Sequence, residues 1–155
     1  MFYPLNKINS HSRIWIYQSD RRIKHNQITA IENQLISFCN NWTSHGNNIK
    51  SSFYIDNWFI CLFADEEVLK VSGCGIDASI SFVKSIGVKY GIDFFNRMNI
   101  AFLSEGETRV LSLSEFKKII NSKMIVYNNM IKYKYEFDSH WKVPIETNWL
   151  KKYIK

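Results

Sequence analysis

The feature that most constrains the fold is the uninterrupted apolar run from Trp58 to Ala64. A run of this length suits a buried strand, and it falls far short of the roughly 18 to 20 apolar residues that cross a bilayer. Before it, Phe53 and Ile55 alternate with polar neighbours, and the Asp56-Asn57 dipeptide favours a tight turn. We therefore expect a hairpin that leads into a central strand.

Two amphipathic helices are predicted, one before and one after this hairpin. The first follows a strand over Arg13–Gln18, and Gly46 is placed to end it. The second follows a glycine-containing segment and is closed by Gly91. Each helix carries an apolar stripe at helical spacing that would pack on a sheet. The stripes comprise Ile28, Ile31, Leu35, Phe38 and Trp42 in the first helix and Ile76, Ile80, Val83 and Tyr90 in the second.

The C-terminal third predicts further strands and short helical segments. Its clearest local signal is Ser112-x-x-Glu115, a capping box that opens a short helix. In the segment from Ile131 to Phe137, apolar and charged residues alternate, which favours a strand. Strands are predicted over 98–103, 108–113, 124–128 and 131–137, and a terminal helical turn over 149–153.

The order of these elements predicts the fold class. The first six run strand, helix, strand, strand, helix, strand, which is the order of a ferredoxin-like split βαβ sandwich. We expect one α+β domain over residues 1–155, in which an antiparallel sheet has helices on one face and a hairpin and helix extend the C-terminal end. A length of 155 residues and a hydrophobic share of 46% are sufficient for one core.

The cysteine pattern and the N-terminus predict a soluble, cytoplasmic protein. Cys39, Cys61 and Cys74 are odd in number and far apart, so no disulfide framework can be written. The first residues lack the charged and apolar regions of a secretory signal. The net charge of +6 would favour anionic partners if it were gathered on one face, but many lysines lie among Asn and Ile, as an AT-rich coding sequence would produce. Only Lys132, Lys134, Lys151, Lys152 and Lys155 resemble a local patch, and a solvated face explains them.

The segment from Ser72 to Asp77 is the strongest candidate for chemistry. Gly73 and Gly75 flank Cys74 and allow the backbone to turn sharply, and Ser72 or Asp77 can cap the helix that follows. A thiol at a helix N-terminus lies at the positive end of the dipole, which favours the nucleophilic thiolate. The alternative is that Cys74 is a small buried residue in a glycine-rich turn.

Two further residues could complete such a site. His45, at the predicted end of the first helix, is a candidate base, and Arg97, just before a predicted strand, is a candidate anion clamp. Alternatively, His45 satisfies terminal helix carbonyls and Arg97 pairs with a carboxylate. The carboxylates in question are Asp65, Glu66 and Asp93.

No cofactor is indicated by the sequence. The four His and three Cys are scattered, whereas tetrahedral zinc sites usually contain close pairs of these residues. No glycine is followed directly by lysine, so the Walker pattern is absent. Gly73-x-Gly75 lies between a predicted strand and a helix, and backbone N–H groups there could bind a phosphate.

Several short motifs resemble those of a family of small Bacteroidota proteins that are often labelled "ABC transporter ATPase". The resemblance spans nearly the whole chain, and Gly75 and Asn148 stand where many relatives have serine. It implies a bacterial, cytoplasmic protein and carries over no catalytic residue. The motifs are Trp15-x-Tyr17, Trp42-x-x-His45-Gly46, Asp65-Glu66, Ser72-Gly73-Cys74-x-Ile76-Asp77, Phe94-Phe95-x-Arg97 and Trp141-x-Val143-Pro144.

Three functions remain as hypotheses, and whether the chain is an enzyme stays open. The first is a non-catalytic binding module for RNA or another protein, with no membrane partner and with an oligomeric state that the sequence does not define. For RNA, the contact surface would be Trp141, Trp149 and Tyr153 beside Lys151 and Lys152. The second is a thiol enzyme or redox sensor using Cys74, and the third is nucleotide binding at the turn between Gly73 and Gly75.

Overall fold

Strand β5 (Phe59–Ala64) lies at the centre of the fold, and every one of its residues is buried. In the computed structural model, which describes residues 1–155, β5 pairs antiparallel with β1 (Arg13–Gln18) on one side and with β4 (Ser51–Ile55) on the other. The turn between β4 and β5 contains Asp56 and Asn57. The predicted hairpin and central strand are therefore confirmed.

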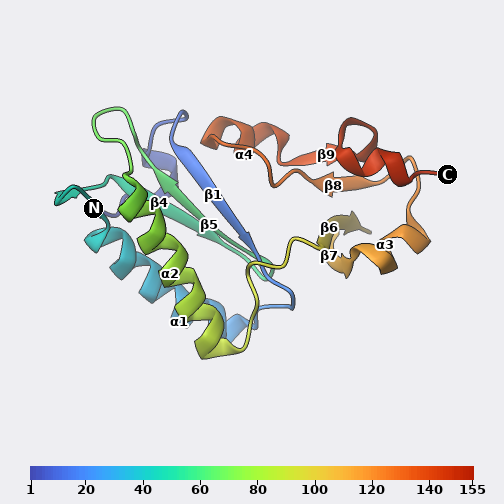
Figure 1. Cartoon of the computed structure of the whole chain (residues 1–155), viewed down its shortest axis with the longest axis horizontal. Coiled ribbons are helices and arrows are strands. Elements are labelled where there is room, and N and C mark those ends of the chain that lie inside the picture. Colours follow the sequence, from blue (N-terminus) through green and yellow to red (C-terminus); the bar gives the residue numbers. More distant parts are fainter.

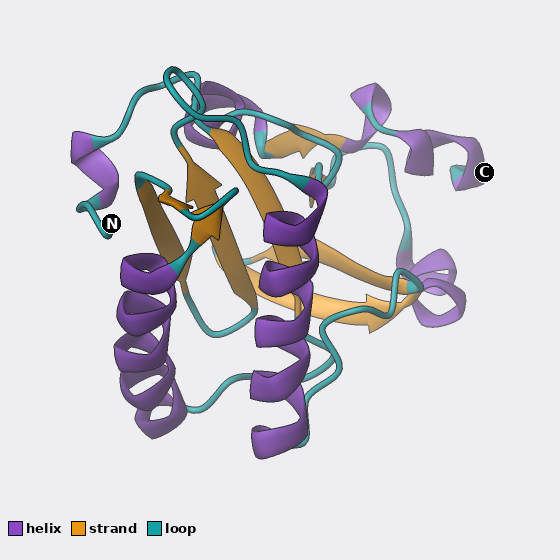
Figure 2. Cartoon of the chain, turned by 60° about the vertical axis from the view of Figure 1, so that its left-hand side comes forward, coloured by secondary structure: helices purple, strands orange, loops and turns teal.

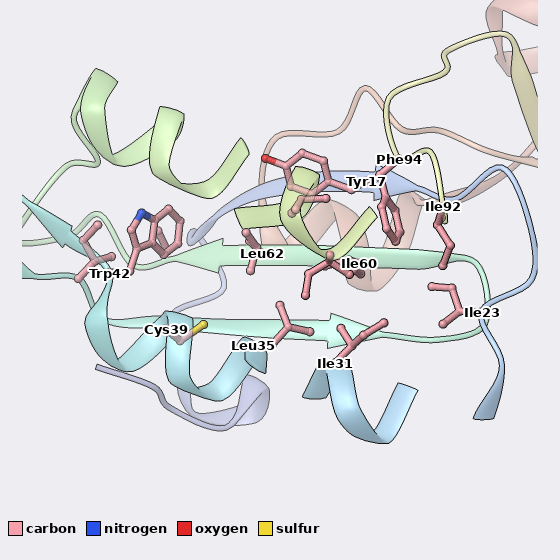
Figure 3. Packing of buried hydrophobic residues seen from close by; sticks show 14 of the residues in the cluster. Tyr17, Ile23, Ile31, Leu35, Cys39, Trp42, Ile60, Leu62, Ile92 and Phe94 are labelled. Carbon is pink, nitrogen blue, oxygen red and sulfur yellow. The ribbon is translucent and has the colours of Figure 1, made fainter. Parts of the chain in front are cut away.

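Helices α1 (His25–Asn41) and α2 (Gly73–Tyr90) cover one face of this sheet (Figures 1 and 2). Alternate residues of β5 point toward them and pack in the largest hydrophobic cluster, part of which Figure 3 shows. Both predicted amphipathic helices are confirmed, but the stripe of the second only in part. Val83 is buried as predicted, whereas Ile80 lies outside the cluster and Ile86, which the predicted stripe did not include, is buried. The cluster includes Ile60 and Leu62 of β5, Ile31 and Leu35 of α1, and Val83 and Ile86 of α2.

The ends of α2 are fixed by local chemistry. The Ser72 hydroxyl accepts a hydrogen bond from the Gly75 N–H at 3.1 Å, so Ser72 is the N-cap and Asp77 is not. At the other end, Gly91 has a φ of 68°, a left-handed conformation that favours glycine. The prediction that Gly91 closes this helix is confirmed.

The prediction that Gly46 ends the first helix is wrong. Helix α1 ends at Asn41, and the chain then forms a small hairpin of β2 (Thr43–Ser44) and β3 (Asn47–Asn48). His45 and Gly46 are its two turn residues, with φ values of 51° and 79°. Two successive positive φ angles suit a two-residue hairpin turn, so the glycine serves a turn rather than a helix end.

A second antiparallel sheet occupies the other half of the molecule (Figure 1). Its strand order is β7-β6-β8-β9. Strand β6 lies in this sheet and not beside β1, the position that the fourth strand of a ferredoxin-like sheet takes. The mixed α/β architecture with antiparallel sheets is confirmed, whereas the ferredoxin-like arrangement is not. The strands are β6 (Asn99–Ser104), β7 (Glu107–Ser112), β8 (Ile125–Tyr127) and β9 (Lys142–Pro144).

The second sheet and its neighbours cover the face of β5 that the helices leave free. Phe59, Cys61 and Phe63 of β5 are fully buried in a second hydrophobic cluster. Residues from beyond the second helix complete that cluster. They are Ala101 of β6, Tyr127 of β8, Ile131 and Trp141. The first sheet therefore has no free face.

A third hydrophobic cluster lies around Phe102 and Phe116, where α3 (Leu113–Ile119) and the C-terminal turns pack on the second sheet. The Ser112 hydroxyl accepts a hydrogen bond from the Glu115 N–H at 3.3 Å, which is one half of the predicted capping box. The Glu115 carboxylate accepts from Lys118 at 3.1 Å instead of completing the box. The predicted terminal turn is confirmed as a 3₁₀ helix. The short 3₁₀ turns are η1 (Leu5–Lys7), η2 (Ile145–Thr147) and η3 (Trp149–Tyr153).

The predicted strand from Ile131 to Phe137 is wrong, because helix α4 (Lys134–His140) begins within it. A Glu136 carboxylate oxygen accepts the backbone N–H groups of Lys132 and Tyr133 at 3.0 and 3.2 Å, which starts the helix. Strand β8, predicted over 124–128, pairs with β9 instead of with this segment. None of the helices combines the length and apolar character that a bilayer crossing requires.

Candidate functional site

Cys74 lies in an open pocket at the start of α2. The side chain is exposed, and the pocket of about 380 Å³ is also lined by His45. The structure therefore brings together two of the three residues proposed for thiol chemistry. Arg97 lies elsewhere, in a separate groove. Asp77 is exposed on α2 and does not line the pocket.

The glycines beside Cys74 have different roles. A Cβ at Gly75 would lie 2.9 Å from Val71 Cγ1 and 3.2 Å from the Thr43 carbonyl oxygen, so this position is closed by packing. A Cβ at Gly73 would meet nothing within 4 Å. Because the Gly75 N–H already bonds to Ser72, the phosphate cradle predicted between the two glycines lacks one of its donors.

His45 has no partner that would make it a directed base. Its side chain is exposed on the β2–β3 turn and forms no hydrogen bond, and no carboxylate lines the pocket to orient the imidazole. Nucleophile–base sites usually include such an orienting group. Nowhere in the chain do three side chains of His, Cys, Asp or Glu lie close enough together to hold a metal ion.

The larger hollow is a groove of about 690 Å³ between α2, β1 and the second sheet, which we call the inter-sheet groove. Segments far apart in the sequence form it. The lining residues used below are Gln18, Lys84, Phe95, Arg97, Asn129 and Trp149. Most of the lining residues are hydrophobic, which is typical of ligand-binding clefts of this size.

The inter-sheet groove carries uncompensated positive charge. Lys84 and Arg97 are exposed cations that line it, and neither takes part in a salt bridge. No Asp or Glu lines the groove. The alternative role proposed for Arg97, pairing with a nearby carboxylate, is not found. The groove therefore favours an anionic ligand.

A chain of hydrogen bonds fixes the polar side chains of the groove. The Trp141 indole Nε1 donates to Asn129 Oδ1 at 3.0 Å, and Asn129 Nδ2 donates to Gln18 Oε1 at 2.8 Å. Gln18 Nε2 then donates to the Asn99 carbonyl oxygen at 3.0 Å. Each carboxamide uses one of its two N–H groups in this chain, so each retains one donor.

Two aromatic rings that line the groove, those of Phe95 and Trp149, each lie near a lysine ammonium. The Lys84 ammonium lies 5.6 Å from the ring centroid of Phe95, and that of Lys152 lies 5.5 Å from the ring of Trp149. Phe95 and Trp149 are 39% and 45% exposed, so both rings are open to a ligand. Each pair places a flat apolar surface next to a positive charge.

The contact surface predicted from the C-terminal sequence needs one correction. Trp141 is only 5% exposed, because its ring packs on Phe59 and Tyr127 in the core between the sheets. It therefore has no surface to offer a partner. Trp149 is exposed as predicted, and Lys151 and Lys152 are exposed beside it, whereas Tyr153 is half-buried against the third hydrophobic cluster.

Sequence reasoning did not identify Gln18, Lys84, Phe95 or Asn129 as site residues. Only the tertiary fold joins the end of β1, the side of α2 and the loop after β8. Of these four residues, only Phe95 could have been found from the sequence, because it lies two residues before Arg97 in the motif Phe94-Phe95-x-Arg97. No protein-family model matches the chain, and no curated protein or solved structure matches it either.

Proposed function

We propose that this protein is a non-catalytic, cytoplasmic binding module whose binding site is the inter-sheet groove. The observation that carries the proposal is the combination of apolar walls, two unpaired cations at Lys84 and Arg97, and no carboxylate. Exposed aromatic rings and cations without a neighbouring carboxylate together fit a negatively charged ligand that has an apolar part.

The ligand that this groove fits is an anion with a flat apolar part. The apolar part would lie against Phe95 or Trp149, and the negative charge would meet Arg97 or Lys84. A volume of about 690 Å³ is in the range of sites that enclose most of a ligand of several rings.

We also propose that β1, α1, β4, β5 and α2 are an incomplete ferredoxin-like unit. The strand order β1-β5-β4 and the two helices on one face agree with that unit. The other face of its sheet is covered by Phe59 packing on Trp141 and Tyr127. Binding on the open sheet face, as ferredoxin-like modules often use, is therefore replaced by binding in the groove.

The proposal is tested with 1-anilinonaphthalene-8-sulfonate, a fluorescent aromatic anion. We expect saturable binding to the folded protein, with affinity lowered at least several-fold by Arg97→Ala and by Phe95→Ala. Arg22→Ala is the matched control, since Arg22 is an exposed arginine without an ion pair and outside the groove. If Arg97→Ala and Phe95→Ala bind the dye as tightly as Arg22→Ala and the unsubstituted protein do, the groove is excluded as the binding site.

A second candidate function, a reactive thiol at Cys74, is favoured by one observation. Cys74 is exposed in the first turn of α2, and His45 lines the same pocket. If His45 activates the thiol, His45→Asn should slow iodoacetamide labelling of Cys74 at neutral pH. Equal labelling rates in the unsubstituted protein and in His45→Asn would show that His45 does not act as a base for Cys74.

A further inference from the structure

The aromatic and cationic surface of the groove continues beyond it. Trp149 lines the groove and also contacts Tyr153, with ring centroids 6.1 Å apart. The ammonium of Lys117, from α3, lies 4.2 Å from the ring centroid of Tyr153, and Lys152 lies near both rings. The groove is thus one end of a longer strip, which we call the aromatic strip: Phe95, Lys84, Arg97, Trp149, Lys152, Tyr153 and Lys117.

From this strip we propose that the ligand of the inter-sheet groove is single-stranded RNA, an inference that rests on the proposed function. Along the strip, each of the three rings has a lysine within 6 Å of its centroid. Single-stranded nucleic acid repeats the complementary pattern, a flat base followed by a phosphate. For each nucleotide, the base would stack on an aromatic ring and the phosphate would pair with the lysine beside that ring.

The polar chain in the groove fits a nucleotide as well. Gln18 and Asn129 each retain one N–H donor, and their orientation is fixed by Trp141 and by the Asn99 carbonyl. Base edges and the ribose 2′-hydroxyl offer acceptors to such donors, and the 2′-hydroxyl is absent from DNA. A duplex would hide its bases from the rings, so the strip favours a single strand. A basic peptide is excluded by charge, because the groove contains no carboxylate.

The test is fluorescence anisotropy with a 5′-fluorescein-labelled decauridylate, titrated with the folded protein at several salt concentrations. We expect Trp149→Ala and Phe95→Ala to weaken binding roughly 5- to 150-fold each, the effect of losing one stacked base. Lys84→Ala should reduce the slope of log affinity against log salt by about 0.7, the value for one phosphate contact on a single strand.

Lys89→Ala is a matched control for Lys84→Ala. Both lysines are exposed on α2, and both lie near a ring, Lys89 at 5.5 Å from the centroid of Tyr90, but only Lys84 lines the groove. We expect Lys89→Ala to leave affinity and salt slope unchanged. Equal losses in the two variants would show that the net charge alone attracts RNA, and would overturn the inference. Circular dichroism verifies that each variant is folded.

The outcomes separate the RNA inference from the proposed function. If decauridylate displaces 1-anilinonaphthalene-8-sulfonate from the groove, both are supported. If the dye binds in a manner sensitive to Arg97→Ala but decauridylate does not bind, the binding module stands and the RNA inference is wrong. If neither binds, both are wrong. A decathymidylate that binds as tightly as decauridylate would overturn the assignment to RNA.

Discussion

The indole Nε1 of Trp42 donates a hydrogen bond of 2.8 Å to the carbonyl oxygen of Gly75. Trp42 is the first residue after α1, and Gly75 lies in the first turn of α2, so the contact joins the two helices at the same end of the sheet. Trp42 is almost fully buried, at one end of the cluster in Figure 3. Both residues line the Cys74 pocket, which therefore lies at a buried, hydrogen-bonded junction of the two helices.

Gly75→Ala should destabilise the protein, whereas Gly73→Ala should not. A methyl group at Gly75 would press on Val71 and on the Thr43 backbone, and overpacking of this kind costs typically about 1–3 kcal/mol. At Gly73 the space is open, and alanine should be neutral or stabilising by about 0.4–1 kcal/mol. Urea unfolding measures both free energies, and equal values for the two variants would contradict the packing at Gly75.

Trp141→Ala and Trp149→Ala should differ in the property they change. Trp141 is buried against Phe59 and Tyr127, so its loss should lower the free energy of unfolding by about 3–5 kcal/mol. Trp149 is 45% exposed, and its loss should cost less than about 1 kcal/mol while weakening ligand binding. Urea or thermal unfolding measures the stability of each variant, and a binding titration measures its affinity for the ligand. A large loss of stability in Trp149→Ala would argue against a surface role for Trp149.

One thiol per chain should react with Ellman's reagent in the native state, and three in denaturant. Cys74 is exposed, whereas Cys39 and Cys61 are fully buried on opposite faces of the first sheet. Burial also raises the pKa of both buried thiols, which disfavours the reactive thiolate. Native labelling that persists in Cys74→Ser would contradict the burial of the other two.

Stability should decrease above about pH 9. Burial raises the pKa of Cys39 from 9.0 to about 11, so the folded state keeps its thiol protonated where the unfolded state has lost the proton. The protonated Cys39 thiol contributes fully to the free energy of unfolding at pH values below its pKa in the unfolded state. This contribution, roughly 2–3 kcal/mol, is lost as the pH rises through the pKa of the thiol in the folded state.

Cys39→Ala removes the titrating thiol and should therefore flatten this decrease. The measurement is the urea unfolding free energy at pH 8, 9 and 10 for the native protein and the variant. Parallel curves for the two proteins would show that Cys39 is not the cause. Cys61, Tyr17 and Tyr127 also have pKa values raised chiefly by burial, so a shallower decrease should remain in the variant.

The elements that the sequence predicts correctly are those with strong local signals. The apolar run of β5 and the Gly91 end of α2 depend on burial and backbone conformation that few residues can supply. Helix α4 was predicted as a strand because its first residues alternate, although Phe137 and Trp141 lie four residues apart and stack at 4.8 Å. That spacing, together with the i,i+4 ion pair of Lys134 and Asp138, was the helical signal that the alternation obscured.

The candidate sites were less accessible to sequence reasoning than the fold. Cys74 and His45 were singled out by residue type, and the β2–β3 hairpin brings them to one pocket. Arg97 was assigned to the same place but lines the groove, because the loop after α2 lies at the opposite end of that helix from Cys74. Asn129 lines the same groove as Arg97 because β8 pairs with β6, and no local pattern specifies that pairing.

Because β5 is shared by two hydrophobic clusters, the two sheets should not open independently. Detaching the second sheet would hydrate Phe59, Cys61 and Phe63 at once, which makes a partly open state costly. Backbone amides of β5 should therefore exchange with deuterium only when the whole molecule unfolds, and calorimetry should record a single cooperative transition rather than two.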